Sequence, residues 1–171
     1  MTPHLVRPLL LALGLSLGWA WPAAAQTPDL PFTAAEIEAA QYDGSDLPRG
    51  RSALTAKVQL LLDRSGTSPG VIDGFKGGMS QSAIKAFERR TGLPQDGVMD
   101  PHVWNLLQSF ATRPVTQTYV VTAEDAAGLA ASIPTDYAEK ALMPAMAHTS
   151  IAERLGERFH MDEKFIEFLN P

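Results

Sequence analysis

The chain has 171 residues, of which 14 are basic and 19 acidic, giving a formal net charge of −5. It contains no cysteine, which excludes disulfide bonds and a cysteine nucleophile. The acidic balance and the absence of a basic arm or basic amphipathic helix argue against a nucleic-acid partner.

Residues 1–25 have the pattern of a secretory signal peptide. A single basic residue, Arg7, precedes a short apolar run, and Ala23 and Ala25 stand at the −3 and −1 positions of a cleavage site. The apolar run is shorter than the roughly 20 residues that a membrane-spanning helix needs. We therefore expect an exported protein, cleaved after Ala25, that resides in the periplasm or cell wall and keeps no stable membrane span.

Residues 26–50 are expected to form a leader with one short helix. Thr33 and Glu36 have the spacing of a capping box, which predicts a helix near Ala34–Gln41. The sequence "DGSDLPRG" then ends it, because glycine and proline disfavour helix interiors. This leader has one basic and five acidic residues, whereas residues 51–112 have seven basic and five acidic ones. The positive middle segment suits an anionic partner, and ordinary solvated helix faces explain it equally well.

Residues 51–112 carry the clearest helical periodicity and are predicted to form three helices around one core. The apolar residues of the first helix fall on one face: Leu54, Val58, Leu61 and Leu62. Gly66 is suited to end this helix in a left-handed conformation. The second helix is expected to have Ser80 as its N-cap and Gly92 as its stop.

The third helix is expected to begin within "PQDGVMDPHVW". Asp100 fits the N-cap, and Pro101 fits the first helical position, where its missing N–H is not needed. Val103, Trp104 and Leu107 are then predicted to face the core.

Two Asp-Gly pairs precede the second and third helices. Asp73-Gly74 and Asp96-Gly97 are 23 residues apart in the sequence. Glycine adopts positive φ without a Cβ clash, and the aspartate side chain accepts bonds from nearby backbone N–H groups. Both pairs are therefore interpreted mainly as turns, whose loops are also candidates to border a glycan groove.

Residues 113–171 are less regular. The alternation in "VTQTYVV" predicts one short strand near Thr118–Thr122. Ser150 and Glu153 form a second capping-box pattern, and Asp162 is expected to cap a further helix that carries Phe165.

Taken together, residues 54–107 resemble the three-helix peptidoglycan-binding module of bacterial wall enzymes. The matches to that family's pattern occur in order: Val58, Asp73, Gly74, Ala83, Ile84, Phe87, Gly92, Leu93, Asp96, Gly97, Trp104 and Leu107. The chain departs from the pattern at Glu88, where the family has glutamine, and at Asp100 and Val103, where it has glycine and threonine. The resemblance implies a helical fold and peptidoglycan as partner.

The segment "LGERFHMDEKFIEFLNP" is similar to the helical half of a LysM domain, a βααβ unit. The order of signal peptide, peptidoglycan-binding module and LysM-like segment resembles the N-terminal part of a periplasmic L,D-transpeptidase. The resemblance implies a truncated LysM-like segment at 113–171, without the catalytic domain whose cysteine those enzymes use.

The candidate ligand-binding residues belong to the two Asp-Gly loops and the third helix: Asp73, Gly74, Phe75, Lys76, Asp96, Gly97 and Trp104. Trp104 is interpreted chiefly as a core residue, with sugar stacking by an exposed edge as the alternative. The basic residues Lys57, Arg64, Lys76, Lys85, Arg89 and Arg90 include candidates for contacts with stem-peptide carboxylates. Most of these are expected to be solvated surface.

Asp96, Asp100 and His102 also raise the question of a metal or acid–base site. Zinc-type sites need three or four converging ligands, and Asp100 is already assigned as a helix cap. We therefore predict no catalytic residues, no metal and no cofactor.

The sequence predicts a mainly α protein with a compact three-helix module and a small, incomplete α+β tail. Its expected function is non-catalytic binding to peptidoglycan. Two alternatives remain open: an N-terminal fragment of an L,D-transpeptidase-like enzyme, and an envelope protein-interaction module without sugar binding.

Overall fold

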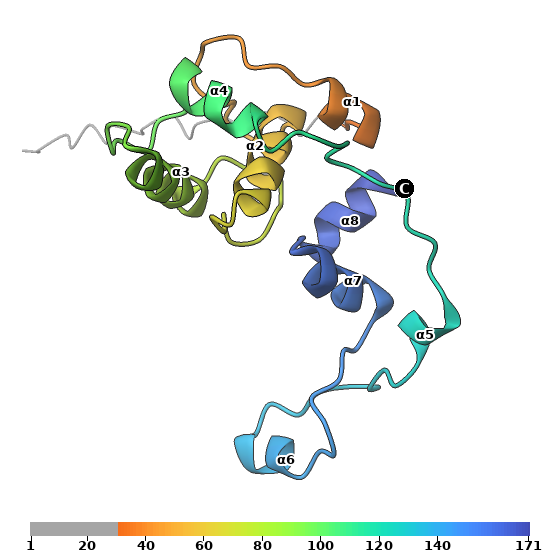
Figure 1. The fold of residues 1–171 in the computed structure, drawn as a ribbon. Helices are drawn as coiled ribbons and strands as arrows, with labels where there is room; N and C mark the ends of the chain where they lie inside the picture. Colours follow the sequence, from red (N-terminus) through yellow and green to blue (C-terminus); the bar gives the residue numbers. More distant parts are fainter. Residues whose placement is uncertain (1–30) are drawn as a thin grey trace, which may run out of the picture.

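The computed structural model describes residues 31–171, so the predicted signal peptide and its cleavage after Ala25 lie outside the described residues. The described chain is mainly helical, as predicted (Figure 1). Its helices are, in order, α1 (Ala34–Ala39), α2 (Ala53–Arg64), α3 (Gly78–Thr91), α4 (Pro101–Gln108), α5 (Ala123–Ala126), α6 (Tyr137–Ala141), α7 (Ile151–Phe159) and α8 (Glu163–Leu169). Within residues 31–171, none of them is long and apolar enough to cross a membrane.

Most helix ends lie where the cap residues predicted them. Thr33 and Glu36 form the complete capping box of α1. Asp100 caps α4 by accepting a bond of 2.8 Å from the Val103 N–H, with Pro101 at the start of the helix. Gly92 ends α3 in the left-handed region, at φ 78°. These local bonds satisfy N–H groups that have no partner within the helix.

The start of α3 differs from the prediction. The helix begins at Gly78 with Gly77 as N-cap, so Ser80 lies within the first turn instead of capping it. The Ser80 side chain is buried and its hydroxyl bonds the Phe75 carbonyl and the Gln59 amide. The hydroxyl that the sequence assigned to the cap therefore stabilises the preceding loop.

The core lies between α2, α3 and α4 and extends beyond them. It contains Val58, Leu61, Leu62, Ile84, Phe87, Val103 and Leu107 from these helices. Ile37 and Leu47 of the leader and Phe165 of α8 belong to the same cluster and are nearly or fully buried. One core thus takes side chains from both sides of the predicted boundaries at residues 50 and 112.

The leader lies across α2 and α4. The buried ammonium of Lys57 on α2 donates to the carbonyl oxygens of Glu38 and Ala40, at 2.7 and 2.8 Å. These carbonyls come from the C-terminal end of α1, where unpaired acceptors favour a cation. The Tyr42 ring packs against Trp104, with ring centroids 6.0 Å apart.

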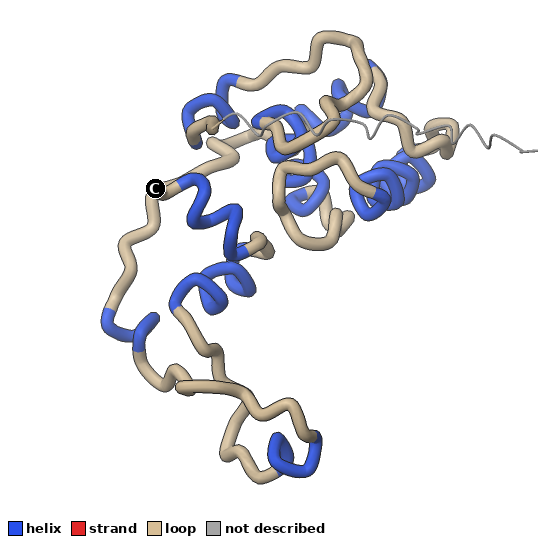
Figure 2. The backbone as a smooth tube through the Cα atoms, turned by 180° about the vertical axis from the view of Figure 1, so that it is seen from behind, coloured by secondary structure: helices blue, strands red, loops and turns tan. Residues whose placement is uncertain are grey.

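The predicted strand at Thr118–Thr122 is wrong. That segment has no strand in the structure, and the tail is helical rather than α+β (Figure 2). Its polar groups are used locally instead: the Tyr119 hydroxyl and the Thr122 N–H both donate to Asp125. The α+β arrangement expected of a LysM-like unit is therefore not confirmed.

Asp125 fastens this segment to α7. Its side chain is 1% exposed and forms an ion pair of 2.7 Å with Arg158. The Thr122 N–H bond, reinforced by the Tyr119 and Thr122 hydroxyls and by Arg158, lowers the pKa of Asp125 to about 2 despite its burial. The segment is thus held by a buried carboxylate instead of a β-ladder.

The capping box predicted at the start of α7 forms only in part. Ser150 accepts a bond from the Glu153 N–H, but the Glu153 carboxylate accepts its return bond from Thr149, one residue further back. Beyond this point α7 and α8 pack beside the module, whereas α6 lies at the tip of a loop directed away from it (Figures 1 and 2).

Candidate functional site

A buried glutamine, Gln59 on α2, holds the loop between α2 and α3. Its carbonyl oxygen accepts bonds from the N–H groups of Asp73 and Gly74, at 3.1 and 2.8 Å. Its amide nitrogen donates to the Asp73 carboxylate, the Phe75 carbonyl and the Ser80 hydroxyl. Both ends of one buried amide are thus satisfied, which fixes the loop in a single conformation.

Asp73 and Gly74 form the turn that the sequence predicted. The Asp73 carboxylate accepts a bond of 2.9 Å from the Phe75 N–H, and Gly74 has φ +76°. Asp73 also accepts from Gln59, so two of its acceptor sites serve the turn. The aspartate is structural, and only its remaining lone pairs are available to a ligand.

Phe75 and Lys76 have partners outside the loop. The Arg51 guanidinium lies 4.6 Å from the Phe75 ring centroid and 4.8 Å from that of Phe168 on α8. Lys76 forms an ion pair with Asp46 of the leader. The loop that carries the predicted ligand residues is therefore bordered by both the leader and the tail.

A shallow pocket of about 170 Å³ opens beside this loop. Asp73 and Phe75, two of the predicted residues, line it together with Gln59 and Ser80. Val71 and Met79 stand at its margin and are 56% and 65% exposed. The result is a small, mainly apolar depression that includes two exposed apolar side chains, Val71 and Met79, which we call the Val71–Met79 ridge.

Asp96 and Gly97 form the matching turn between α3 and α4. Asp96 is exposed and its carboxylate accepts a bond of 2.8 Å from the Val98 N–H. The Gly97 N–H donates to the carboxylate of Glu88, whose side chain is buried. Burial raises the pKa of Glu88, the Gly97 bond opposes this rise, and the nearby Asp96 adds to it.

Trp104 lies apart from both loops. It is 8% exposed, with Tyr42 against its ring and the Lys57 ammonium 5.9 Å from its centroid. The structure therefore places it in the core, under the leader, and leaves little of its edge for a sugar. Of the predicted residues, the fold brings Asp73 and Phe75 to one pocket and leaves Asp96 and Trp104 elsewhere.

Asp96, Asp100 and His102 do not come together as one site, and His102 lies exposed within α4. Asp100 is engaged as the α4 cap, while Asp96 serves its own turn. No group of three or more histidine, cysteine, aspartate or glutamate side chains within residues 31–171 has an arrangement that would hold a metal ion.

The same helices and turns coincide with a known sequence family. Residues 51–107 match the family model of a putative peptidoglycan binding domain. This match supports a peptidoglycan-binding role and fits a location in the cell wall or envelope. No curated protein sequence matches the chain.

The matched range covers α2, α3, α4 and both Asp-Gly turns. Glu88, the departure noted from the sequence, is the residue that supports the second turn of this module. The resemblance to a LysM domain and to an L,D-transpeptidase arrangement concerns residues outside the match.

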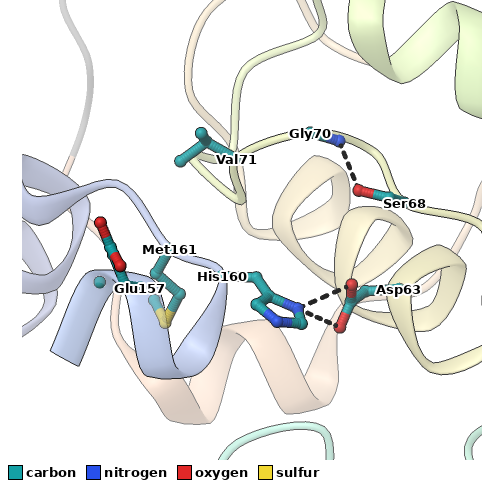
Figure 3. Close-up of a pocket in the computed structure, with 8 residues that line it drawn as sticks. Asp63, Ser68, Gly70, Val71, Glu157, His160 and Met161 are labelled. Carbon is teal, nitrogen blue, oxygen red and sulfur yellow. Dashed lines mark hydrogen bonds and ion pairs between the residues drawn. The ribbon is translucent and has the colours of Figure 1, made fainter. Parts of the chain in front are cut away.

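A second pocket, of about 430 Å³, lies between the module and the tail, and sequence reasoning missed it (Figure 3). The module contributes Asp63, Ser68 and Val71, and the tail contributes Glu157, His160 and Met161. No sequence signal joins these positions, because residues almost 100 apart meet only through the docking of the tail on the module.

Proposed function

We propose that this is an exported, non-catalytic protein that attaches to peptidoglycan through its module at residues 51–107. The observation that carries the proposal is the family match, which coincides with the loop that Gln59 holds rigid. Rigid presentation lowers the entropy lost on binding, so a shallow contact surface gains affinity from it.

The Val71–Met79 ridge and the neighbouring pocket are the proposed contact surface. Exposed apolar side chains beside a few fixed polar groups suit a ligand that alternates apolar and polar faces, as a glycan does. The remaining lone pairs of the Asp73 carboxylate would supply the polar contact, because the N–H groups of residues 73–75 already donate within the turn.

Among the basic residues considered in the sequence, three remain as candidates for the stem-peptide carboxylates. Lys85, Arg89 and Arg90 are exposed on α3. Lys57, Arg64 and Lys76, in contrast, already bond to carbonyl oxygens or to Asp46. Contacts from α3 would be screened by salt, because exposed charges interact weakly beyond the Debye length.

We further propose that the chain acts by binding alone. L,D-transpeptidase chemistry of the cysteine type has no nucleophile in residues 1–171, which contain no cysteine.

Sedimentation with purified insoluble peptidoglycan tests the proposal. We expect the protein to co-sediment at low and moderate salt, and the variant Met79→Asp to lose most of this retention, since Met79 lines this pocket and not the second one. Val120→Asp is the matched control, since Val120 is 76% exposed but lies in the tail. A wild-type protein that stays in the supernatant at both salt concentrations would overturn the proposal and favour the protein-interaction alternative.

A further inference from the structure

Main-chain hydrogen bonds join the segment of the module and the segment of the tail that form the pocket between them. The Ile72 N–H donates to the His160 carbonyl at 2.8 Å, and the Asp162 N–H donates to the Ile72 carbonyl at 3.0 Å. Phe165, one turn further, is fully buried in the core of the module. The two walls of the pocket are therefore fixed before any ligand arrives, which favours binding.

The walls of this pocket are apolar, and its rim is acidic. Val71 comes from the module side and Met161 from the tail, while Gly70 and Gly156 add backbone without side chains (Figure 3). The volume of about 430 Å³ is within the range of small-molecule sites. A short aliphatic chain would replace water along these walls.

The charged groups at the rim are carboxylates. Asp63 and Glu157 line opposite sides of the pocket, and no lysine or arginine of the described residues lines it with them (Figure 3). The Glu157 carboxylate lies 3.4 Å from Nε2 of His148, whereas Asp63 is the carboxylate that bonds the pocket's histidine, His160. Both oxygens of Asp63 face the Nδ1 atom of His160, at 3.0 and 3.2 Å, which orients the carboxylate (Figure 3). Such a rim attracts a cationic group and repels a carboxylate.

We propose that this pocket is a second binding site, which takes an aliphatic chain that ends in a primary ammonium. The stem lies between Val71 and Met161, and the ammonium donates a charge-assisted hydrogen bond to Asp63, while Glu157 adds negative charge at the other side of the rim. The chemistry of the ligand follows from the pocket. Its source, the side chain of a diamino acid in a peptidoglycan stem peptide, rests on the proposed function.

Together, the basic residues of α3 and the acidic pocket would contact different groups of the same ligand. Lys85, Arg89 and Arg90 on α3 suit the carboxylates of a stem peptide, whereas the pocket at the tail suits its amine. Because the pocket needs both walls, an occupying ligand stabilises the docked position of the tail.

Titration of the purified full chain with two small probes tests the site directly. Nα-acetyl-lysine amide carries the ammonium, and Nα-acetyl-norleucine amide carries a similar aliphatic stem without it. We expect the lysine probe to shift the NMR signals of the His160 ring and the Gly70 and Gly156 amides, and to bind at least tenfold more tightly than the norleucine probe. Equal binding of the two probes, or no shift at these residues, would overturn the proposal.

Two variants locate the ammonium contact. Glu157→Gln changes a side chain that is 73% exposed and faces His148, so it should leave the fold intact and weaken the lysine probe less than the Asp63 variant does. Asp63→Asn keeps an acceptor for His160 and should weaken it about tenfold. Glu167→Gln, on the exposed side of α8, is the control and should change nothing. Unchanged affinity in both pocket variants contradicts the site.

The outcome is separable from that of the proposed function. A protein that binds the lysine probe but fails to sediment with peptidoglycan retains the amine site and refutes the wall-binding proposal. A protein that sediments, loses retention in Met79→Asp and gives no response to the lysine probe retains the wall-binding proposal and refutes the amine site.

Discussion

Gly97 occupies a position at which any Cβ atom meets the backbone of α3. A Cβ built there would lie 2.9 Å from the Gln81 carbonyl oxygen, and the residue has φ +75°. We expect Gly97→Ala to lower the free energy of unfolding by about 1–3 kcal/mol, from backbone strain and the displaced helix together. Chemical denaturation of the variant and the wild type measures this difference in the free energy of unfolding.

Gly92→Ala is the matched control for this substitution. Gly92 has a similar φ, 78°, but its Cβ would meet nothing within 4 Å. The Gly92→Ala variant should therefore lose only the stability that the strain of the left-handed conformation costs. Equal destabilisation by the two variants would show that the contact with α3 is unimportant.

Glu88 carries a carboxylate in a buried place that the related family fills with glutamine. Its pKa is raised by burial, so the protonated form is favoured in the folded state. The contribution of Glu88 to stability is therefore fully present below its unfolded pKa, about 4.5, and is lost as pH rises through its folded pKa.

Glu88→Gln should consequently stabilise the protein at pH 7, by an amount of order 1 kcal/mol, because the neutral amide still accepts the Gly97 N–H. At pH 4 the gain should nearly vanish. Thermal unfolding at both pH values measures the difference, with the exposed Glu167→Gln as control. A gain that is equal at pH 4 and pH 7 would contradict the assigned protonation state.

At the scale of elements, helix α8 contributes one residue that decides whether the tail stays docked. Phe165 is fully buried in the main core and packs against Phe32 and Phe168. We expect Phe165→Ala to reduce stability by about 3–5 kcal/mol, the usual range for removal of a buried phenylalanine. Hydrogen exchange should show α7 and α8 losing protection first.

Phe159→Ala provides the comparison for that prediction. Phe159 is only partly buried and packs on Tyr119 within the tail, outside the main core. Its removal should affect α7 and the segment at 119–125 without loosening the module. Identical exchange patterns for the two variants would mean that Phe165 does not anchor the tail.

Helix ends were predictable because their signals are local. Thr33, Asp100 and Gly92 act through bonds within four residues, so the sequence contains all the partners. The segment at Thr118–Thr122 could not be predicted in the same way. Its β-branched residues favour a strand, but a strand needs a partner, and Asp125 offers bonds to Tyr119 and Thr122 instead.

At the scale of the whole molecule, the leader and the tail both pack on the module and also contact each other, at Phe32 and Phe165. The family resemblance located the module and its turns, since those residues recur in order. It could not reveal that Ile37, Leu47 and Phe165 complete the core, because long-range packing leaves no short sequence pattern. The pocket shared by module and tail was missed for the same reason.

The packing of the leader on the module depends on Lys57, which is 5% exposed and donates to two carbonyl oxygens at the end of α1. We expect Lys57→Met to keep the packing of the stem but to release the leader, because the two carbonyls lose their donor. Limited proteolysis should then cut residues 38–50 faster, while Lys85→Met on exposed α3 should not change the rate. Unaltered cleavage in Lys57→Met would contradict this role.

The contact between Tyr42 and Trp104 gives the protein an optical signal of its own. Trp104 is the only tryptophan after residue 21, so a chain cleaved after Ala25 has a single indole. That indole is shielded by the leader and lies beside the Lys57 ammonium. Its emission wavelength therefore reports whether the leader is seated, without any attached dye, and allows the seating to be followed while the protein is mixed with cell-wall fragments.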